Sequence, residues 1–118
     1  MSSPIRDRHI TVRPRGGLVT VRVGNTVVSR SERALDLLEG AYKTVIYIPR
    51  EDVDETVLER TDHTTYCPCK GEANYFSIVH EAGTIENAAW TYEAPLPDVS
   101  QIKNALAFYP SKVKLETE

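Results

Sequence analysis

Residues 64–80 read TTYCPCKGEANYFSIVH, and this stretch decides the fold. Its two ends are rich in Thr, Tyr, Phe, Ile and Val, which favour β-strands. Between them stands Cys67-Pro68-Cys69-Lys70-Gly71, in which proline and glycine supply the backbone conformations that a tight turn needs. The stretch therefore predicts two strands, 64–66 and 72–80, joined by a turn in a small β-rich domain.

Similar short strands are expected on both sides of this hairpin. Between positions 18 and 23, valine at 19, 21 and 23 alternates with Thr20 and Arg22, which is the pattern of a half-buried strand. The same reasoning predicts strands at 10–13, 18–23, 26–29, 44–48, 87–92, 105–109 and 112–116.

Three segments are expected to be helical. Ser29 stands three residues before Glu32, as in a capping box, and the alanine and leucines that follow would form an apolar face that ends at Gly40. Shorter helical turns are expected at 51–60 and 99–104. Many short strands with these few helical pieces predict a mainly β fold, in which antiparallel sheets pack as a sandwich or an open barrel.

The length of 118 residues is typical of one domain with one core, and we expect the ordered core at about residues 9–115. The N-terminus has no apolar signal region, and no apolar run approaches the ~20 residues of a membrane span. Two cysteines separated by one residue are poorly placed for a disulfide. These features predict a cytoplasmic protein without a membrane partner.

Arginine is concentrated in the N-terminal third of the chain. Residues 1–33 hold seven arginines against Asp7 and Glu32, a balance of +5, whereas the remainder holds seven basic and fifteen acidic residues, a balance of −8. Such an excess could contact the phosphates of a nucleic acid. We instead expect these arginines to lie on solvated strand faces and to pair with the acidic remainder, so nucleic acid is not the expected partner.

Cys67 and Cys69 are the residues of the turn that could carry chemistry. A zinc knuckle places its thiolates two residues apart, but here the spacing is one residue short, and the chain has no second cysteine pair. A catalytic cysteine would need a neighbouring cation, for which His63 and Lys70 are the local candidates. We expect no metal and no cofactor, and we interpret the cysteines as small apolar side chains at a strand end.

Asp52 and Asp54 form an Asp-x-Asp pair a dozen residues after Gly40. Nucleotidyltransferases use such a pair on a strand to hold metal ions, while the phosphates approach a Gly-Ser turn. Here the turn lacks serine, and the two carboxylates stand at an expected helix start, where acidic residues stabilise the helix dipole. We therefore predict no catalytic residue in this pair.

Aromatic residues gather around the turn. Tyr75 follows it directly, Trp90 and Tyr92 share one strand face because they are two residues apart, and Tyr47 belongs to another strand. With Lys70 at the rim, these rings could line a concave site for a planar or amide-bearing small molecule. The alternative for Tyr47 and Trp90 is simple core packing.

Five motifs, read in order, resemble a bacterial family, the one described as domain of unknown function 427 and sometimes labelled nucleotidyltransferase-like. They are Ser31-x-x-Ala34-Leu35-x-Leu37, Tyr47-Ile-Pro-Arg-Glu-Asp-Val53, Thr65-x-Cys67-Pro68-x-Lys70-Gly71-x-Ala73-x-Tyr75, Ala89-Trp90-x-Tyr92-x-x-Pro95 and Ala107-Phe108-Tyr109. The likeness runs from about His9 to Leu115. It implies a β-tent, in which two antiparallel sheets meet at an angle and are pinned at the apex.

The resemblance also sets this chain apart from other proteins with that fold. In zinc-bearing relatives the apex holds two cysteine knuckles, and the thalidomide-binding domain of cereblon adds a cage of three tryptophans for a cyclic imide. This chain lacks the second knuckle, and Trp90 is its only tryptophan. It also carries Cys69 where the family usually has tyrosine. A shared ligand does not follow from a shared fold.

We therefore expect a non-catalytic domain that binds a small ligand in an aromatic pocket formed by Tyr47, Lys70, Tyr75, Trp90 and Tyr92. One alternative is an enzyme that uses Cys67 or the aspartate pair. Another is a structural or interaction module that assembles with itself or with a partner protein through an exposed sheet face.

Overall fold

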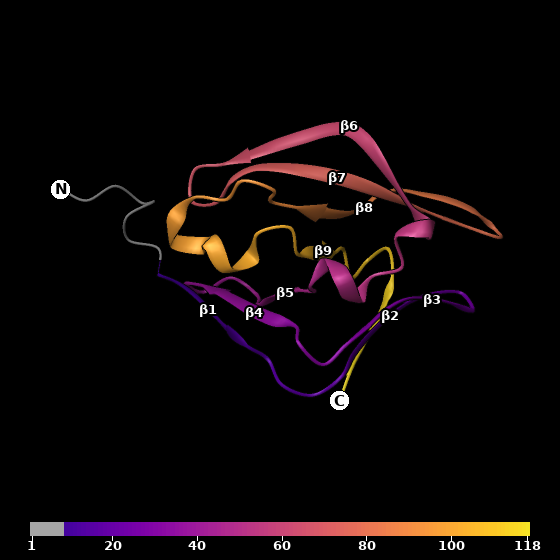
Figure 1. The fold of residues 1–118 in the computed structure, drawn as a ribbon, viewed down its shortest axis with the longest axis horizontal. Coiled ribbons are helices and arrows are strands. Elements are labelled where there is room, and N and C mark those ends of the chain that lie inside the picture. The colour runs from indigo at the N-terminus through magenta and orange to yellow at the C-terminus, as the bar shows by residue number, and fades with distance from the viewer. Residues whose placement is uncertain (1–8) are drawn as a thin grey trace.

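The computed structural model describes residues 9–118, which form ten strands and three short 3-10 helices (Figure 1). In chain order these are β1 (Ile10–Pro14), β2 (Val19–Val23), β3 (Thr26–Ser31), β4 (Leu35–Glu39), β5 (Val45–Tyr47), η1 (Arg50–Asp52), η2 (Glu55–Val57), β6 (Leu58–Cys67), β7 (Gly71–His80), β8 (Gly83–Thr91), η3 (Pro97–Ile102), β9 (Leu106–Phe108) and β10 (Lys114–Thr117).

The strands form antiparallel sheets, which confirms the mainly β class. There are three sheets in this part of the chain rather than the expected two: β1-β4-β5, β10-β2-β3 and β6-β7-β8-β9. Figure 1 shows β6 and β7 as an upper layer, with the two three-stranded sheets below them. The β1-β4-β5 sheet and the four-stranded sheet are joined by one bridge, in which Ile48 and Leu106 exchange two backbone hydrogen bonds of 2.8 Å. Pro49 follows directly and has no N–H to continue the pairing.

The prediction of a helix at 29–40 is wrong, because this segment contains the end of β3 and the whole of β4. Leu35 and Leu37 fit the two-residue period of a strand as well as the helical period, and they pair with Tyr47 and Val45 of β5. Pairing with β1 on one side and β5 on the other makes β4 a central strand. This tertiary pairing outweighs the local capping signal.

The two shorter helical predictions fare better. In the segment 51–60, the end of η1 and the whole of η2 are helical, but the last three residues already belong to β6. η3 covers most of the turn expected at 99–104. None of the helices within residues 9–118 is long and apolar enough to cross a membrane. β6 is longer than the expected strand at 64–66. Its first half was not predicted because it is polar, and its pairing with β7 shifts register between Arg60 and Thr64.

The four-stranded sheet is buried on both faces at its centre, around β7 and the end of β8. Tyr75 and Trp90 lie opposite each other on β7 and β8, and Phe76 and Ala89 form the next pair. Because successive strand residues point to opposite faces, the two pairs face opposite sides. Phe76 and Ala89 belong to a core shared with the β10-β2-β3 sheet, whereas Tyr75 and Trp90 belong to a core shared with the β1-β4-β5 sheet.

Ion pairs neutralise part of the positive charge of the arginine-rich N-terminal third. Three arginines of the N-terminal third bind acidic side chains from distant segments: Arg15 with Asp36 at 2.9 Å, Arg22 with Glu116 at 2.8 Å and Arg33 with Asp52 at 2.9 Å. Arg6 and Arg8 lie outside the described residues. For these three arginines, pairing with the acidic remainder is confirmed.

Candidate functional site

Five aromatic side chains meet in the core between the four-stranded sheet and the β1-β4-β5 sheet. We call them the aromatic cluster: Tyr47, Tyr75, Trp90, Tyr92 and Tyr109. The structure therefore brings together the four rings expected from the sequence and adds Tyr109. Three of these rings are almost fully buried, whereas Trp90 and Tyr109 are half-buried.

The indole of Trp90 is held from behind. Its Nε1–H donates to the hydroxyl of Tyr47 at 3.2 Å, and the two rings meet edge to face with their centroids 6.4 Å apart. Tyr47 is only 1% exposed, so it forms a rigid support for the indole. Tyr109 lies beside the indole, with a centroid distance of 4.6 Å and an angle of 46° between the rings.

Tyr75 connects the cluster to β6. Its hydroxyl lies 3.0 Å from Oγ1 of Thr65, and its ring packs in an edge arrangement against the exposed His63 ring, with the ring centroids 4.5 Å apart. Burial and a hydrogen bond with Tyr75 raise the pKa of Tyr109 to about 12. Tyr109 therefore stays protonated at neutral pH and presents a hydroxyl group that is part of a hydrogen-bonded pair.

Tyr47 and Tyr92 are the most perturbed phenols of the cluster. Burial raises the pKa of each well above its ordinary value of 10.0, and the nearby Cys67 and Glu39 raise it further by repulsion of a phenolate. Both groups therefore remain neutral O–H donors near pH 7. The hydroxyl of Tyr47 accepts the Trp90 hydrogen bond, so its own proton stays available for donation.

A buried ion pair lies next to the aromatic cluster. Lys70 Nζ donates to Glu39 Oε1 at 2.8 Å, and the two side chains are 11% and 10% exposed. Lys70 belongs to the turn between β6 and β7, whereas Glu39 is the last residue of β4. The pair therefore ties this turn to the β1-β4-β5 sheet. Lys70 Nζ also lies 3.7 Å from Cys67 Sγ.

Glu39 is a functional candidate that was not predicted from the sequence. Leu35, Leu37 and Glu39 are two residues apart along β4 and share one face of the strand. The two-residue period of a strand would have predicted that Glu39 points inward with Leu35 and Leu37. The segment was instead interpreted as a helix, so Glu39 was not recognised.

The turn itself is closed by the backbone. The Lys70 N–H donates to the Cys67 carbonyl at 3.1 Å, and the Lys70 carbonyl accepts from the Leu96 N–H at 2.9 Å. Gly71 has a φ of 110°, a conformation that side chains rarely adopt, so glycine is required here. Both cysteines are half-buried free thiols, and no group of His, Cys, Asp and Glu within residues 9–118 is arranged to hold a metal ion.

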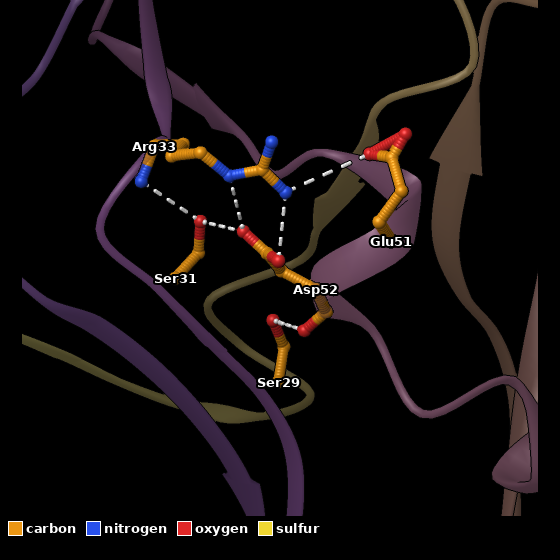
Figure 2. Close-up of polar contacts among 5 residues, drawn as sticks. All are labelled: Ser29, Ser31, Arg33, Glu51 and Asp52. Atoms are coloured by element: carbon orange, nitrogen blue, oxygen red, sulfur yellow. Dashed lines mark hydrogen bonds and ion pairs between the residues drawn. The ribbon is translucent and has the colours of Figure 1, made fainter.

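Asp52 is part of a hydrogen-bonded network between β3 and η1 (Figure 2). Its carboxylate accepts from Ser31 Oγ at 2.7 Å and from Arg33 Nη2 at 2.9 Å, and its backbone carbonyl accepts from Ser29 Oγ at 2.7 Å. These bonds fasten η1 to β3 and to the β3–β4 connection. They occupy the carboxylate that a nucleotidyltransferase would need for metal ions.

Asp54 has different partners from Asp52. It stands before η2 and accepts from the Thr56 N–H at 3.0 Å and from the Thr56 hydroxyl at 2.6 Å. A surface hollow of about 700 Å³ adjoins Asp52, and its charged lining of Arg30, Glu32, Arg33 and Glu118 mixes both signs. The two aspartates thus serve separate local structures and do not form a shared site.

Replacing Asp52 should change how the protein responds to acid. The hydrogen bonds from Arg33 and Ser31 lower the pKa of Asp52 below its ordinary value of 3.8. This contribution to stability is present above the unfolded-state pKa and is lost as the pH falls through the folded-state pKa. We expect the free energy of unfolding to fall less between about pH 6 and pH 3 in Asp52→Asn than in the unmodified protein.

Asp62→Asn is the matched control for this prediction, because Asp62 is exposed on β6. Urea unfolding at both pH values measures the difference. If Asp52→Asn and the unmodified protein lose the same stability in acid, the Asp52 network is not a source of the acid sensitivity.

The fold and the site together define a small, mainly β domain with an aromatic cluster and a buried ion pair at a tight turn. Residues 11–118 match the family model described as Domain of unknown function (DUF427), which is named NTP_transf_9. The chain belongs to this family, so the resemblance seen in its motifs is confirmed. A comparison with curated proteins gave no match.

Proposed function

We propose that this chain is a non-catalytic binding domain for a small planar ligand, which stacks on the half-buried part of the aromatic cluster. The observation that carries this proposal is the indole of Trp90, which is fixed by Tyr47 behind it and Tyr109 beside it. A ring that is already held in place loses little conformational freedom when a ligand stacks on it. Such preorganisation favours recognition of a flat molecule.

The other members of the site have supporting roles in this proposal. Tyr47 and Tyr92 are 1% and 6% exposed, so they support the ring surface and supply O–H donors at its base. Tyr75 adds a hydroxyl between Thr65 and Tyr109.

Lys70 sets the charge preference of the proposed site. Its ammonium is already bonded to Glu39, so it forms a polar edge without a net positive charge. This neutral edge favours an uncharged, amide-bearing ligand over a strongly anionic one.

A thermal-shift screen with nucleosides, cyclic imides and small neutral metabolites tests this proposal. A ligand at a hundred times its Kd should stabilise the protein by about 2.7 kcal/mol and raise its Tm. Tyr109→Ala removes one wall of the stacking surface and should abolish most of the shift. Tyr66→Ala is the matched control, because Tyr66 is 69% exposed and lies outside the cluster. An equal shift in both variants, or no stabilising compound, contradicts the proposal.

A cysteine-dependent enzyme is the second candidate, favoured by one observation. Lys70 Nζ lies 3.7 Å from Cys67 Sγ and thus supplies the neighbouring cation that such a cysteine needs. Cys67→Ser separates the two functions, since a binding domain keeps its ligand affinity and an enzyme loses turnover. The two free thiols also fit a reducing compartment such as the cytoplasm.

A further inference from the structure

We propose that Cys67 and Lys70 form a covalent sulfur–nitrogen link on oxidation, which makes the turn between β6 and β7 a redox-sensitive modification site. Cys67 Sγ and Lys70 Nζ are 3.7 Å apart and in direct contact. The two residues belong to one turn, which the hydrogen bond from the Lys70 N–H to the Cys67 carbonyl closes. A small change in two side chains is therefore enough to bring sulfur and nitrogen together.

Glu39 holds the nitrogen in place for this reaction. Its carboxylate binds Lys70 Nζ at 2.8 Å, and both side chains are almost fully buried. A flexible surface lysine would spend little time near the sulfur, whereas this one is fixed beside it. Glu39 is also positioned to accept the proton that the ammonium must lose before its nitrogen can react.

The surroundings favour a small oxidant such as hydrogen peroxide. Cys67 is half-buried, and its neighbours Lys70 and Glu39 are only 11% and 10% exposed. Peroxide can enter such a site, as can a small thiol reductant, whereas the thiol of another protein chain is hindered from reaching the oxidised sulfur. The neighbouring amine then becomes the nearest nucleophile for the sulfenic acid.

The reaction has two balanced steps. First, hydrogen peroxide transfers one oxygen atom to the thiol of Cys67, which becomes a sulfenic acid while the peroxide is reduced to water. Second, the nitrogen of Lys70, deprotonated by Glu39, attacks the sulfur and breaks the S–O bond. The oxygen leaves as a second water molecule with the proton held by Glu39, and the proton that the nitrogen releases as the S–N bond forms passes to the Glu39 carboxylate. The product is a sulfenamide that contains two hydrogen atoms fewer than the reduced chain.

The link would change the electrostatics of the turn. A sulfenamide nitrogen carries no positive charge, so Glu39 loses its ion pair with Lys70. The turn is then no longer tied by this pair to the end of β4, next to the aromatic cluster. Oxidation would thus act on the turn, and a thiol reductant would restore the original pair.

Trypsin digestion after peroxide treatment tests the proposal, because trypsin requires a free lysine side chain. We expect loss of cleavage after Lys70 and a new peptide spanning residues 61–103, since 71–102 contain no lysine or arginine. Its mass should be lower by two hydrogen atoms than that of the reduced peptide, and treatment with a thiol reductant should restore cleavage.

Cys67→Ser and Cys69→Ser are the matched variants. The first must abolish the resistant peptide, and the second must retain it. A disulfide between Cys67 and Cys69 would also remove two hydrogen atoms, but it would leave Lys70 cleavable and would disappear in Cys69→Ser. Normal cleavage after Lys70 in fully oxidised protein overturns the proposal, as does a resistant peptide with any other mass change.

Discussion

Glu39→Gln is expected to lower the free energy of unfolding by about 3 to 5 kcal/mol, which is the usual effect of removing one partner from a buried ion pair. The substitution leaves the Lys70 ammonium buried and without its carboxylate at 2.8 Å. Small proteins are stable by about 5 to 15 kcal/mol, so the loss would be a large part of the total. Urea unfolding followed by circular dichroism measures it.

Two further variants separate this effect from general damage to the core. Glu51→Gln removes a glutamate whose side chain is 73% exposed and 3.9 Å from Arg33, so the unfolding midpoint should not change. The double variant Glu39→Leu/Lys70→Met replaces the pair by apolar groups and should recover most of the lost stability. If the double variant is as unstable as Glu39→Gln, the buried charge is not the cause.

Tyr47→Ala is expected to cost about 3 to 5 kcal/mol of unfolding free energy, because it removes a buried ring from the support of Trp90. Tyr47→Phe keeps the ring but removes the hydroxyl that accepts the Trp90 N–H, and it should cost about 1 kcal/mol. Tyr66→Ala, at an exposed position, should remain within about 0.5 kcal/mol of the unmodified protein. Chemical unfolding of the three variants gives the comparison.

Near-ultraviolet circular dichroism adds a second readout for Tyr47. Loss of the support should weaken the signal of the indole in Tyr47→Ala more than in Tyr47→Phe. If Tyr47→Ala is no more destabilising than Tyr66→Ala, the ring does not support the cluster.

The strands could be predicted where side chains alternate, and the turn could be predicted from its proline and glycine. Residues 18–23 show the alternation clearly, and β2 lies there. The prediction for the segment 29–40 failed because its leucines fit both the helical period and the two-residue period of a strand. Only the pairing of β4 with β1 and β5 decides between the two. Such pairing involves residues that are distant in sequence, so local patterns do not contain it.

The candidate site shows the same division. A shared strand face was enough to group Trp90 with Tyr92, but the contact of Tyr109 with Trp90 depends on the packing around β8 and β9. The sequence did not show whether the Lys70 side chain reaches Cys67, because this contact depends on the geometry of the turn. Glu39 could be predicted to point inward, where it pairs with Lys70, only if β4 was recognised as a strand.

Fluorescence of Trp90 is the most direct test of the proposed binding site, because Trp90 is the only tryptophan of the chain. A stabilising compound from the thermal-shift screen should change this fluorescence in a saturable way, with the same affinity in Tyr66→Ala. In Tyr109→Ala the Kd should rise by about tenfold or more, since stacking on one aromatic ring contributes about 1 to 3 kcal/mol. A compound that stabilises the protein without changing Trp90 fluorescence, or that binds Tyr109→Ala equally well, would contradict a ligand site at the aromatic cluster.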